Sequence, residues 1–255
     1  MTPEDTSVLA RRAIGLLDLT DLSDTCSGEA IRQLCQRAVT PHGTVAAVCI
    51  WPRFVSEARP RLAGTGVRLA TVINFPRGGD NIDRAVTDTR EALKDGADEI
   101  DLVMPYHAFL AGDEAVASDM IEAVGESLPA HAQLKVILET GALEDDRLIA
   151  RAATLALKAG AHFIKTSTGK TAVSATPGAA RVMLEAIKAA GGHAGFKAAG
   201  GVRTLEDAAL YIGLADTIMG AGWADARHFR IGASGLLDVL LATLDGGAAI
   251  PQGGY

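Results

Sequence analysis

The chain has 255 residues, close to the roughly 250 that one (β/α)8 barrel needs. Its 48% hydrophobic residues suffice for a sizeable core, and a net charge of −7 without a basic cluster argues against a nucleic-acid-binding protein. Because three cysteines without a CxxC pair, no apolar leader and no apolar run of about 20 residues are present, we expect a soluble cytoplasmic protein without disulfides or contact with a membrane.

Short apolar or β-branched runs alternate with longer helical patterns along the whole chain. The predicted strands, in order, are 16–19, 44–50, 69–73, 98–104, 134–139, 162–166, 194–197 and 216–219. Apolar residues recur with the period of a helix between several of these runs, as at 82–93, 116–124 and 205–212. Two helix starts carry their own signals, because Thr176 before Pro177 is typical of an N-cap and Thr204 with Asp207 of a capping box.

A weak internal repeat supports the same alternation. The segments KDGADEI (94–100), KAGAHFI (158–164) and IGLADTI (212–218) resemble one another, and each is interpreted as a helix end, a turn and a strand. Eight strands joined by helical crossovers favour a closed (β/α)8 TIM barrel, with a doubly wound open sheet as the alternative. No composition break divides the chain, so we expect a single domain over 1–255 with a flexible tail from about 246 to 255.

Polar residues interrupt the apolar strands near their C-terminal ends, where barrel enzymes place their active sites. They are Asp101, Glu139, Lys165 and Lys197. A lone lysine at such a position more often packs its stem and sends its amine to water. Two lysines and an aspartate on three strands need a joint explanation, because a buried charge costs several kcal/mol unless it is paired.

Schiff-base chemistry supplies that explanation. At the usual lysine pKa of about 10.4, roughly one amine in 2,500 is neutral at pH 7, whereas a pKa near ~7 leaves about half of them nucleophilic. Burial and a second cation lower a lysine pKa in this way, so Lys165 and Lys197 can activate one another. Either could be the nucleophile, and Asp101 would transfer protons.

Glycine-rich segments after the last three strands predict a phosphate site. Glycines let backbone amides approach an anion, and the apolar helix that begins after GASG (232–235) would point its N-terminus at it, although any one glycine could simply serve a turn. The first strand adds two residues that could line the pocket or cap a turn, and Cys49 suits the core or a pocket wall better than a nucleophile. The residues expected to bind substrate or phosphate are Asp18, Thr20, Cys49, Thr168, Gly169, Lys170, Gly200, Gly201, Arg203, Gly232, Ser234 and Gly235.

Two other motifs are not met. STGKT resembles the end of a nucleotide-binding loop, but Ile164 stands where that loop requires glycine. The six histidines show no metal-binding spacing, so we expect neither a metal nor another cofactor.

At these positions the chain resembles the deoxyribose-phosphate aldolases, a class I aldolase family with a (β/α)8 barrel. The resemblance runs nearly end to end, and FIKTSTGK (163–170) together with GFKAAGGVRT (195–204) is its most specific part. Further matching segments are LLDLT (16–20), AAVCIWPRF (46–54), ATVINFPRG (70–78), GADEIDLVMPY (96–106), LKVILETG (134–141) and GAGWADARHFRIGAS (220–234).

The resemblance implies a role for each catalytic residue. Lys165 would form the Schiff base, Lys197 would lower its pKa, Asp101 would relay protons, and Tyr255 at the end of the tail could reach the site as a proton donor. The implied reaction is the reversible cleavage of 2-deoxy-D-ribose 5-phosphate into D-glyceraldehyde 3-phosphate and acetaldehyde. The chain departs from the family pattern at Ala198, where proline is usual, and at Gly235, where a second serine is usual.

Three rival functions fit parts of the same pattern. A Schiff-base barrel for a longer deoxy or keto sugar phosphate would use the same two lysines. A sugar-phosphate-binding barrel without activity would bind its ligand without forming an imine. An isomerase on this fold would need a carboxylate base and no covalent lysine. In each case the partners are small molecules (aldehydes and sugar phosphates), and we expect a homodimer, the commonest soluble oligomer.

Overall fold

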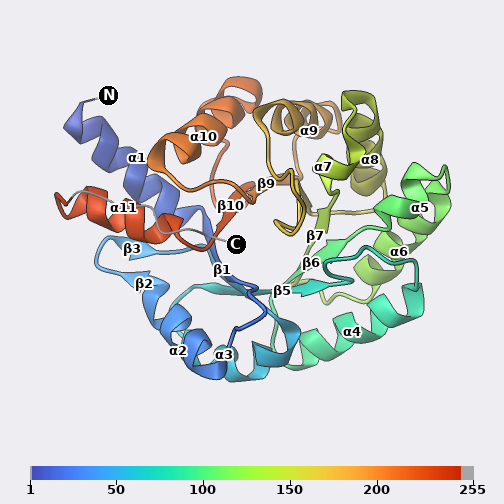
Figure 1. Ribbon diagram of the computed structural model, residues 1–255, viewed down its shortest axis with the longest axis horizontal. Helices are drawn as coiled ribbons and strands as arrows, with labels where there is room; N and C mark the ends of the chain where they lie inside the picture. Colours follow the sequence, from blue (N-terminus) through green and yellow to red (C-terminus); the bar gives the residue numbers. More distant parts are fainter. Residues whose placement is uncertain (1, 248–255) are drawn as a thin grey trace.

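The computed structural model describes residues 2–247, in which eight parallel strands close into a barrel surrounded by helices (Figure 1). Around the barrel the order is β1-β10-β9-β8-β7-β6-β5-β4, so the open-sheet alternative is excluded. The barrel strands are β1 Leu17–Asp21, β4 Ala47–Ile50, β5 Arg68–Ile73, β6 Glu99–Val103, β7 Gln133–Ile137, β8 Phe163–Lys165, β9 Gly195–Ala199 and β10 Phe229–Ala233. A separate antiparallel ribbon pairs β2 (Val39–Thr40) with β3 (Gly43–Thr44).

The helices lie outside the strands and cover the barrel all round (Figure 1). They are α1 Pro3–Gly15, α2 Gly28–Arg37, α3 Val55–Leu62, α4 Ile82–Lys94, α5 Tyr106–Leu110, α6 Glu114–Glu126, α7 Thr140–Leu143, α8 Asp146–Lys158, α9 Pro177–Ala189, α10 Leu205–Met219 and α11 Leu236–Leu244, with a 3-10 turn at Pro52–Phe54. The first helix, α1, precedes the barrel and packs against α11 and α10, which brings the two ends of the described chain together.

The predicted helix signals are confirmed. The side chain of Thr176 accepts a hydrogen bond from the backbone N–H of Ala179 at the start of α9, where Pro177 is the first helical residue. Thr204 and Asp207 form a complete capping box at the start of α10. These bonds satisfy N–H groups that have no partner within the helix, and so fix where each helix begins.

The prediction of a strand at 216–219 is wrong. These residues end α10, and the eighth strand is β10, ten residues further on. The segment 212–218 resembles the two true helix-to-strand junctions, but its apolar residues continue the buried face of α10. Gly232 therefore lies inside β10 rather than after it, and α11 begins after Gly235.

The apolar core lies between the strands and the helices, where residues such as Ile164 of β8 and Leu184 of α9 belong to one buried cluster. The barrel interior is different, because it holds charged side chains. No helix in the described part of the chain is long and apolar enough to cross a membrane. Most of the tail predicted at 246–255, including Tyr255, lies outside the described residues.

Candidate active site

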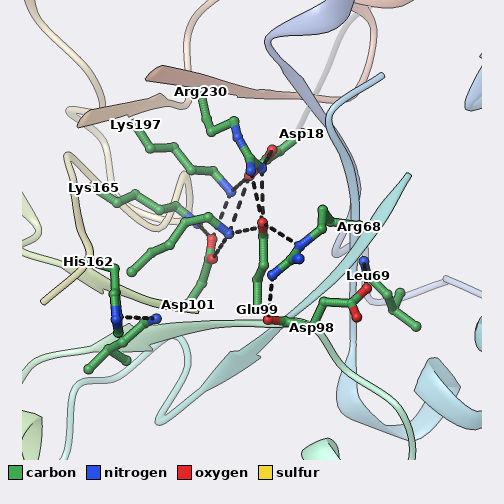
Figure 2. A network of polar contacts seen from close by, with 12 residues as sticks. Asp18, Arg68, Leu69, Asp98, Glu99, Asp101, His162, Lys165, Lys197 and Arg230 are labelled. Atoms are coloured by element: carbon green, nitrogen blue, oxygen red, sulfur yellow. Dashed lines mark hydrogen bonds and ion pairs between the residues drawn. The ribbon is translucent and has the colours of Figure 1, made fainter. Parts of the chain in front are cut away.

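Seven charged side chains meet inside the barrel and form one network (Figure 2). They lie on six strands, because parallel strands at matching register place their inward residues side by side. Lys165 pairs with Lys197 across β8 and β9, and Asp101 pairs with Lys135 across β6 and β7. All seven are buried: Asp18, Glu99, Asp101, Lys135, Lys165, Lys197 and Arg230.

Asp101 is the centre of the part of this network that lies toward the C-terminal ends of the strands, called the upper part below. Its Oδ2 accepts hydrogen bonds from Lys165 Nζ and from Lys197 Nζ, each at 2.8 Å. Its Oδ1 accepts from Lys135 Nζ at 3.0 Å. Lys197 has a second acceptor, Asp18 Oδ2 at 2.5 Å, whereas Asp101 is the one carboxylate that Lys165 contacts among the described residues.

Glu99 and Arg230 form the lower part, which lies toward the N-terminal ends of the strands. The Arg230 guanidinium donates to both oxygens of Glu99, at 2.8 and 3.1 Å, and to Asp18 Oδ1 at 2.8 Å. Lys135 Nζ donates to Glu99 Oε2 at 2.5 Å and so joins the two parts. Arg68 reaches Glu99 from the barrel rim, with its side chain partly exposed (Figure 2).

The buried network contains four basic groups and three carboxylates. With every group ionised these buried side chains would carry one surplus positive charge, which is costly. It becomes neutral when one amine loses its proton. Lys165 is the amine with the fewest acceptors, so it is the one that the arrangement favours in the neutral form.

The pKa shifts follow from these contacts. Burial lowers the pKa of Lys165, and the charge of Lys197 lowers it further against the opposing pull of Asp101. Burial acts on Lys197 in the same sense, but Asp101 and Asp18 outweigh it and raise the pKa of Lys197 well above the usual value. Although burial opposes its charge, Asp101 has a pKa well below its usual range because Lys135, Lys165 and Lys197 surround it.

A pocket opens above the network at the C-terminal ends of the strands. Lys165 lines it, and Lys197 and Asp101 do not. Eight of the residues predicted to bind substrate or phosphate line it as well. These are Thr20, Thr168, Gly200, Gly201, Arg203, Gly232, Ser234 and Gly235.

The loops after β9 and β10 form the glycine-rich wall of this pocket. Gly200 and Gly201 adopt φ of +80° and +84°, a left-handed conformation that glycine adopts without strain. Gly235 is the N-cap of α11 and has no side-chain cap, so the first N–H groups of that helix are free of a capping side chain. An apolar helix with an uncapped N-terminus beside two glycines is suited to bind an anion.

The structure places the other predicted residues near this pocket but not in its wall. Asp18 belongs to the charged network, and Gly169 and Lys170 lie in the loop behind Gly200. Cys49 is buried in a small apolar cluster with Leu22, and burial raises the pKa of its thiol, which disfavours the nucleophilic thiolate.

Sequence reasoning missed Glu99, Lys135 and Arg230. A signal for Glu99 and Lys135 was present. Glu99 and Asp101 are two residues apart on one strand and must share a face, and two buried carboxylates on one face need basic partners on a neighbouring strand. Among residues 2–247 no group of three or more histidine, cysteine, aspartate or glutamate side chains is arranged to hold a metal ion.

Comparison with known proteins identifies the family of this chain. The family model "DeoC/LacD family aldolase" matches residues 12–240. The chain belongs to this family. It is therefore an aldolase, a lyase that acts on carbon–carbon bonds of small molecules.

Solved structures agree with the family. The chain is similar to a tetrameric deoxyribose phosphate aldolase from Aeropyrum pernix, with 27% identity over 93% of this chain and 91% of that one, at a TM-score of 0.76. It is also similar to an aldolase named QR15, with 28% identity over 91% and 96% of the two chains and a TM-score of 0.78. A protein of Toxoplasma gondii ME49 shares the fold at 24% identity over 97% and 98% of the chains, with a TM-score of 0.86.

Proposed function

We propose that this aldolase reversibly cleaves 2-deoxy-D-ribose 5-phosphate into D-glyceraldehyde 3-phosphate and acetaldehyde, through a Schiff base on Lys165. One observation carries the choice of Lys165. It is the only one of the three network lysines that lines the pocket, and it is the one whose pKa is lowered. The similarity to the Aeropyrum pernix enzyme, which is named a deoxyribose phosphate aldolase, supports the substrate.

In the first half of the reaction, the neutral Lys165 amine attacks the C1 aldehyde of the open-chain sugar. Loss of water from the carbinolamine gives a protonated imine on Lys165. Asp101, hydrogen-bonded to both lysines, can take up and return the protons of these steps, directly or through a water. Lys197 stays charged and keeps Lys165 from being protonated between turnovers.

In the second half, the imine accepts the electron pair of the C2–C3 bond as that bond breaks, and the C3 hydroxyl loses its proton. D-Glyceraldehyde 3-phosphate leaves, and the acetaldehyde enamine remains on Lys165. A proton then adds to C2, and water hydrolyses the resulting imine to free acetaldehyde and the amine. Until D-glyceraldehyde 3-phosphate leaves, its phosphate is held by backbone amides at Gly200, Gly201 and Gly235 and by the charge of Arg203.

The deciding experiment is borohydride trapping with acetaldehyde in the presence of EDTA, followed by peptide mapping in a mass spectrometer. We expect one reduced ethyl adduct on Lys165 that is lost in Lys165→Met. Lys188→Met is a matched control, because Lys188 is an exposed lysine on α9. An adduct at another lysine, or none at all, would contradict the proposal.

A substrate panel then tests the sugar. We expect cleavage of 2-deoxy-D-ribose 5-phosphate to exceed that of longer deoxy or keto sugar phosphates by at least about tenfold in kcat/KM, the value of one displaced polar contact. A higher value for a longer sugar phosphate would leave the Schiff base in place and change the substrate. The homodimer stays a prediction, to be checked by light scattering.

A further inference from the structure

Glu139, two residues after the end of β7, adopts an unusual backbone conformation. It is fully buried, and its φ of 56° and ψ of 59° place it in the left-handed region, which a residue other than glycine rarely occupies. Such a conformation persists where the surroundings hold the residue in place, and it concentrates at functional sites. The mechanism above leaves this carboxylate without a task.

The Glu139 carboxylate is bound by one loop, residues 166–175, which follows β8. Its Oε2 accepts from the Thr168 hydroxyl at 2.5 Å and from the Thr168 backbone N–H at 3.3 Å. Its Oε1 accepts from the Thr171 hydroxyl at 3.2 Å. No ion pair to Glu139 occurs in the described part of the chain. The hydrogen bonds from this loop are therefore what stabilises its carboxylate.

This loop reaches the pocket wall at three successive residues. Thr168 lines the pocket itself, and its hydroxyl accepts a hydrogen bond from the Lys170 backbone N–H at 3.1 Å. Gly169 lies against Gly200, so closely that a Cβ on Gly200 would stand 3.2 Å from the Gly169 Cα. The Lys170 amine donates at 2.8 Å to the carbonyl of Leu22, which lines the same pocket.

We propose that Glu139 is a positioning residue for the phosphate end of the pocket. It fixes loop 166–175, and through that loop it fixes the placement of Gly200 and of the Lys170 amine. The inference rests on the proposed function, because it assumes that the substrate carries a phosphate. It assigns to Glu139 no contact with the reacting atoms.

We expect loss of the Glu139 carboxylate to weaken binding of a phosphorylated substrate but not imine formation with acetaldehyde. Without the carboxylate, the buried N–H and the hydroxyl of Thr168 lose their acceptor, and the Thr171 hydroxyl keeps only the Val173 carbonyl, so the loop must rearrange. Binding of a phosphorylated substrate must then order the loop again, which raises KM. Imine formation with acetaldehyde, which has no phosphate, requires Lys165 and the charged network and leaves the loop unused.

Glu139→Met tests this, because methionine has nearly the same length and no strong acceptor. We expect KM for 2-deoxy-D-ribose 5-phosphate to rise about tenfold, with kcat/KM for unphosphorylated 2-deoxy-D-ribose and the yield of trapped acetaldehyde within about twofold of wild type. Glu139→Gln keeps one acceptor oxygen and should recover part of the loss. Glu144→Met is the matched control, because Glu144 also has a positive φ of 57° but is exposed.

Two outcomes would overturn the proposal. One is an unchanged KM in Glu139→Met; the other is an equal loss for both sugars and for trapping, which would show a general structural role. Binding of inorganic phosphate, measured by calorimetry, keeps the test separate from the reaction. If wild type forms no adduct, the proposed function fails, while weaker phosphate binding by Glu139→Met would still support the positioning role.

Discussion

Lys165 and Lys197 are register partners on neighbouring strands, and both amines donate to the same oxygen of one carboxylate at 2.8 Å. Two charged amines so close repel each other, and the one with the weaker set of acceptors loses its proton first. Lys197 also contacts a second carboxylate, Asp18, whereas Asp101 is the one carboxylate that Lys165 contacts within residues 2–247. The shared oxygen thus explains why two lysines in one site have pKa shifts of opposite direction.

Lys197→Met should move the pH dependence of imine formation to higher pH. The substitution removes the cation that lowers the pKa of Lys165 and leaves Asp101 to Lys165, and both changes raise that pKa. At neutral pH we expect a loss of up to about tenfold for each pKa unit of change, with partial recovery as the pH rises. The measurement is the rate of borohydride-trappable imine against pH. An acid limb at the same pH as in wild type would contradict this account.

Lys135→Met tests the charge balance of the network at a lysine that does not line the pocket. Lys135 has no access to the pocket, but it is one of the three basic groups that balance the three carboxylates when Lys165 is neutral. Its loss favours a protonated Lys165, so the acid limb should again move to higher pH. Arg68→Met is the control, because Arg68 touches the same Glu99 from the partly exposed rim. We expect a smaller shift there, since water screens that charge.

Asp101→Asn should cost stability as well as activity. Removing the carboxylate leaves three amines around a neutral amide, and breaking a buried pair of this kind costs about 3 to 5 kcal/mol. Because the folded-state pKa of Asp101 lies well below its usual value, its stabilising effect is full above the unfolded pKa of about 4 and is lost as the pH falls through the folded value. Urea unfolding should therefore show the largest difference from wild type near neutral pH. A difference that grows with acid would contradict the sign.

The barrel and the strands β8 and β9, which carry Lys165 and Lys197, could be predicted because their signals are local. A strand such as β8 is an apolar run with one polar residue, and Thr204 with Asp207 marks a helix start within four residues. The eighth strand could not be found in this way. Its true segment, Phe229–Ala233, has its apolar run interrupted by Arg230 and Gly232, whereas 212–218 repeats the pattern of the two true helix-to-strand junctions.

The lower network was missed for a different reason. Lys135 lies between Leu134 and Val136, and its charge has meaning only through partners on other strands. Arg230 is 131 residues from Glu99 in the sequence, and closure of the barrel brings them together. Which lysine loses its proton is likewise a property of the assembled network, so the residues alone left both lysines open as the nucleophile.

Gly232→Ala should impair catalysis through a methyl group that the substrate need not touch. Gly232 lies in β10 with ordinary extended backbone, so alanine is tolerated there by the main chain. Its Cβ, however, would stand 3.0 Å from Lys197 Cε and 3.2 Å from Ala199 Cβ, and overpacking of this kind costs about 1 to 3 kcal/mol. Lys197 must then move from Asp101 or Asp18, which weakens its effect on the pKa of Lys165.

The resulting change is an acid limb displaced to higher pH, in the same direction as in Lys197→Met but smaller, measured by the same trapping assay. Gly213→Ala is the matched control, because Gly213 lies on the exposed side of α10 with open space around its Cα. There alanine should stabilise the helix by about 0.5 to 1 kcal/mol and leave the pH profile unchanged. A Gly232→Ala enzyme with the wild-type profile would show that Lys197 has room to move without consequence, and that its position is less critical than the hydrogen bonds indicate.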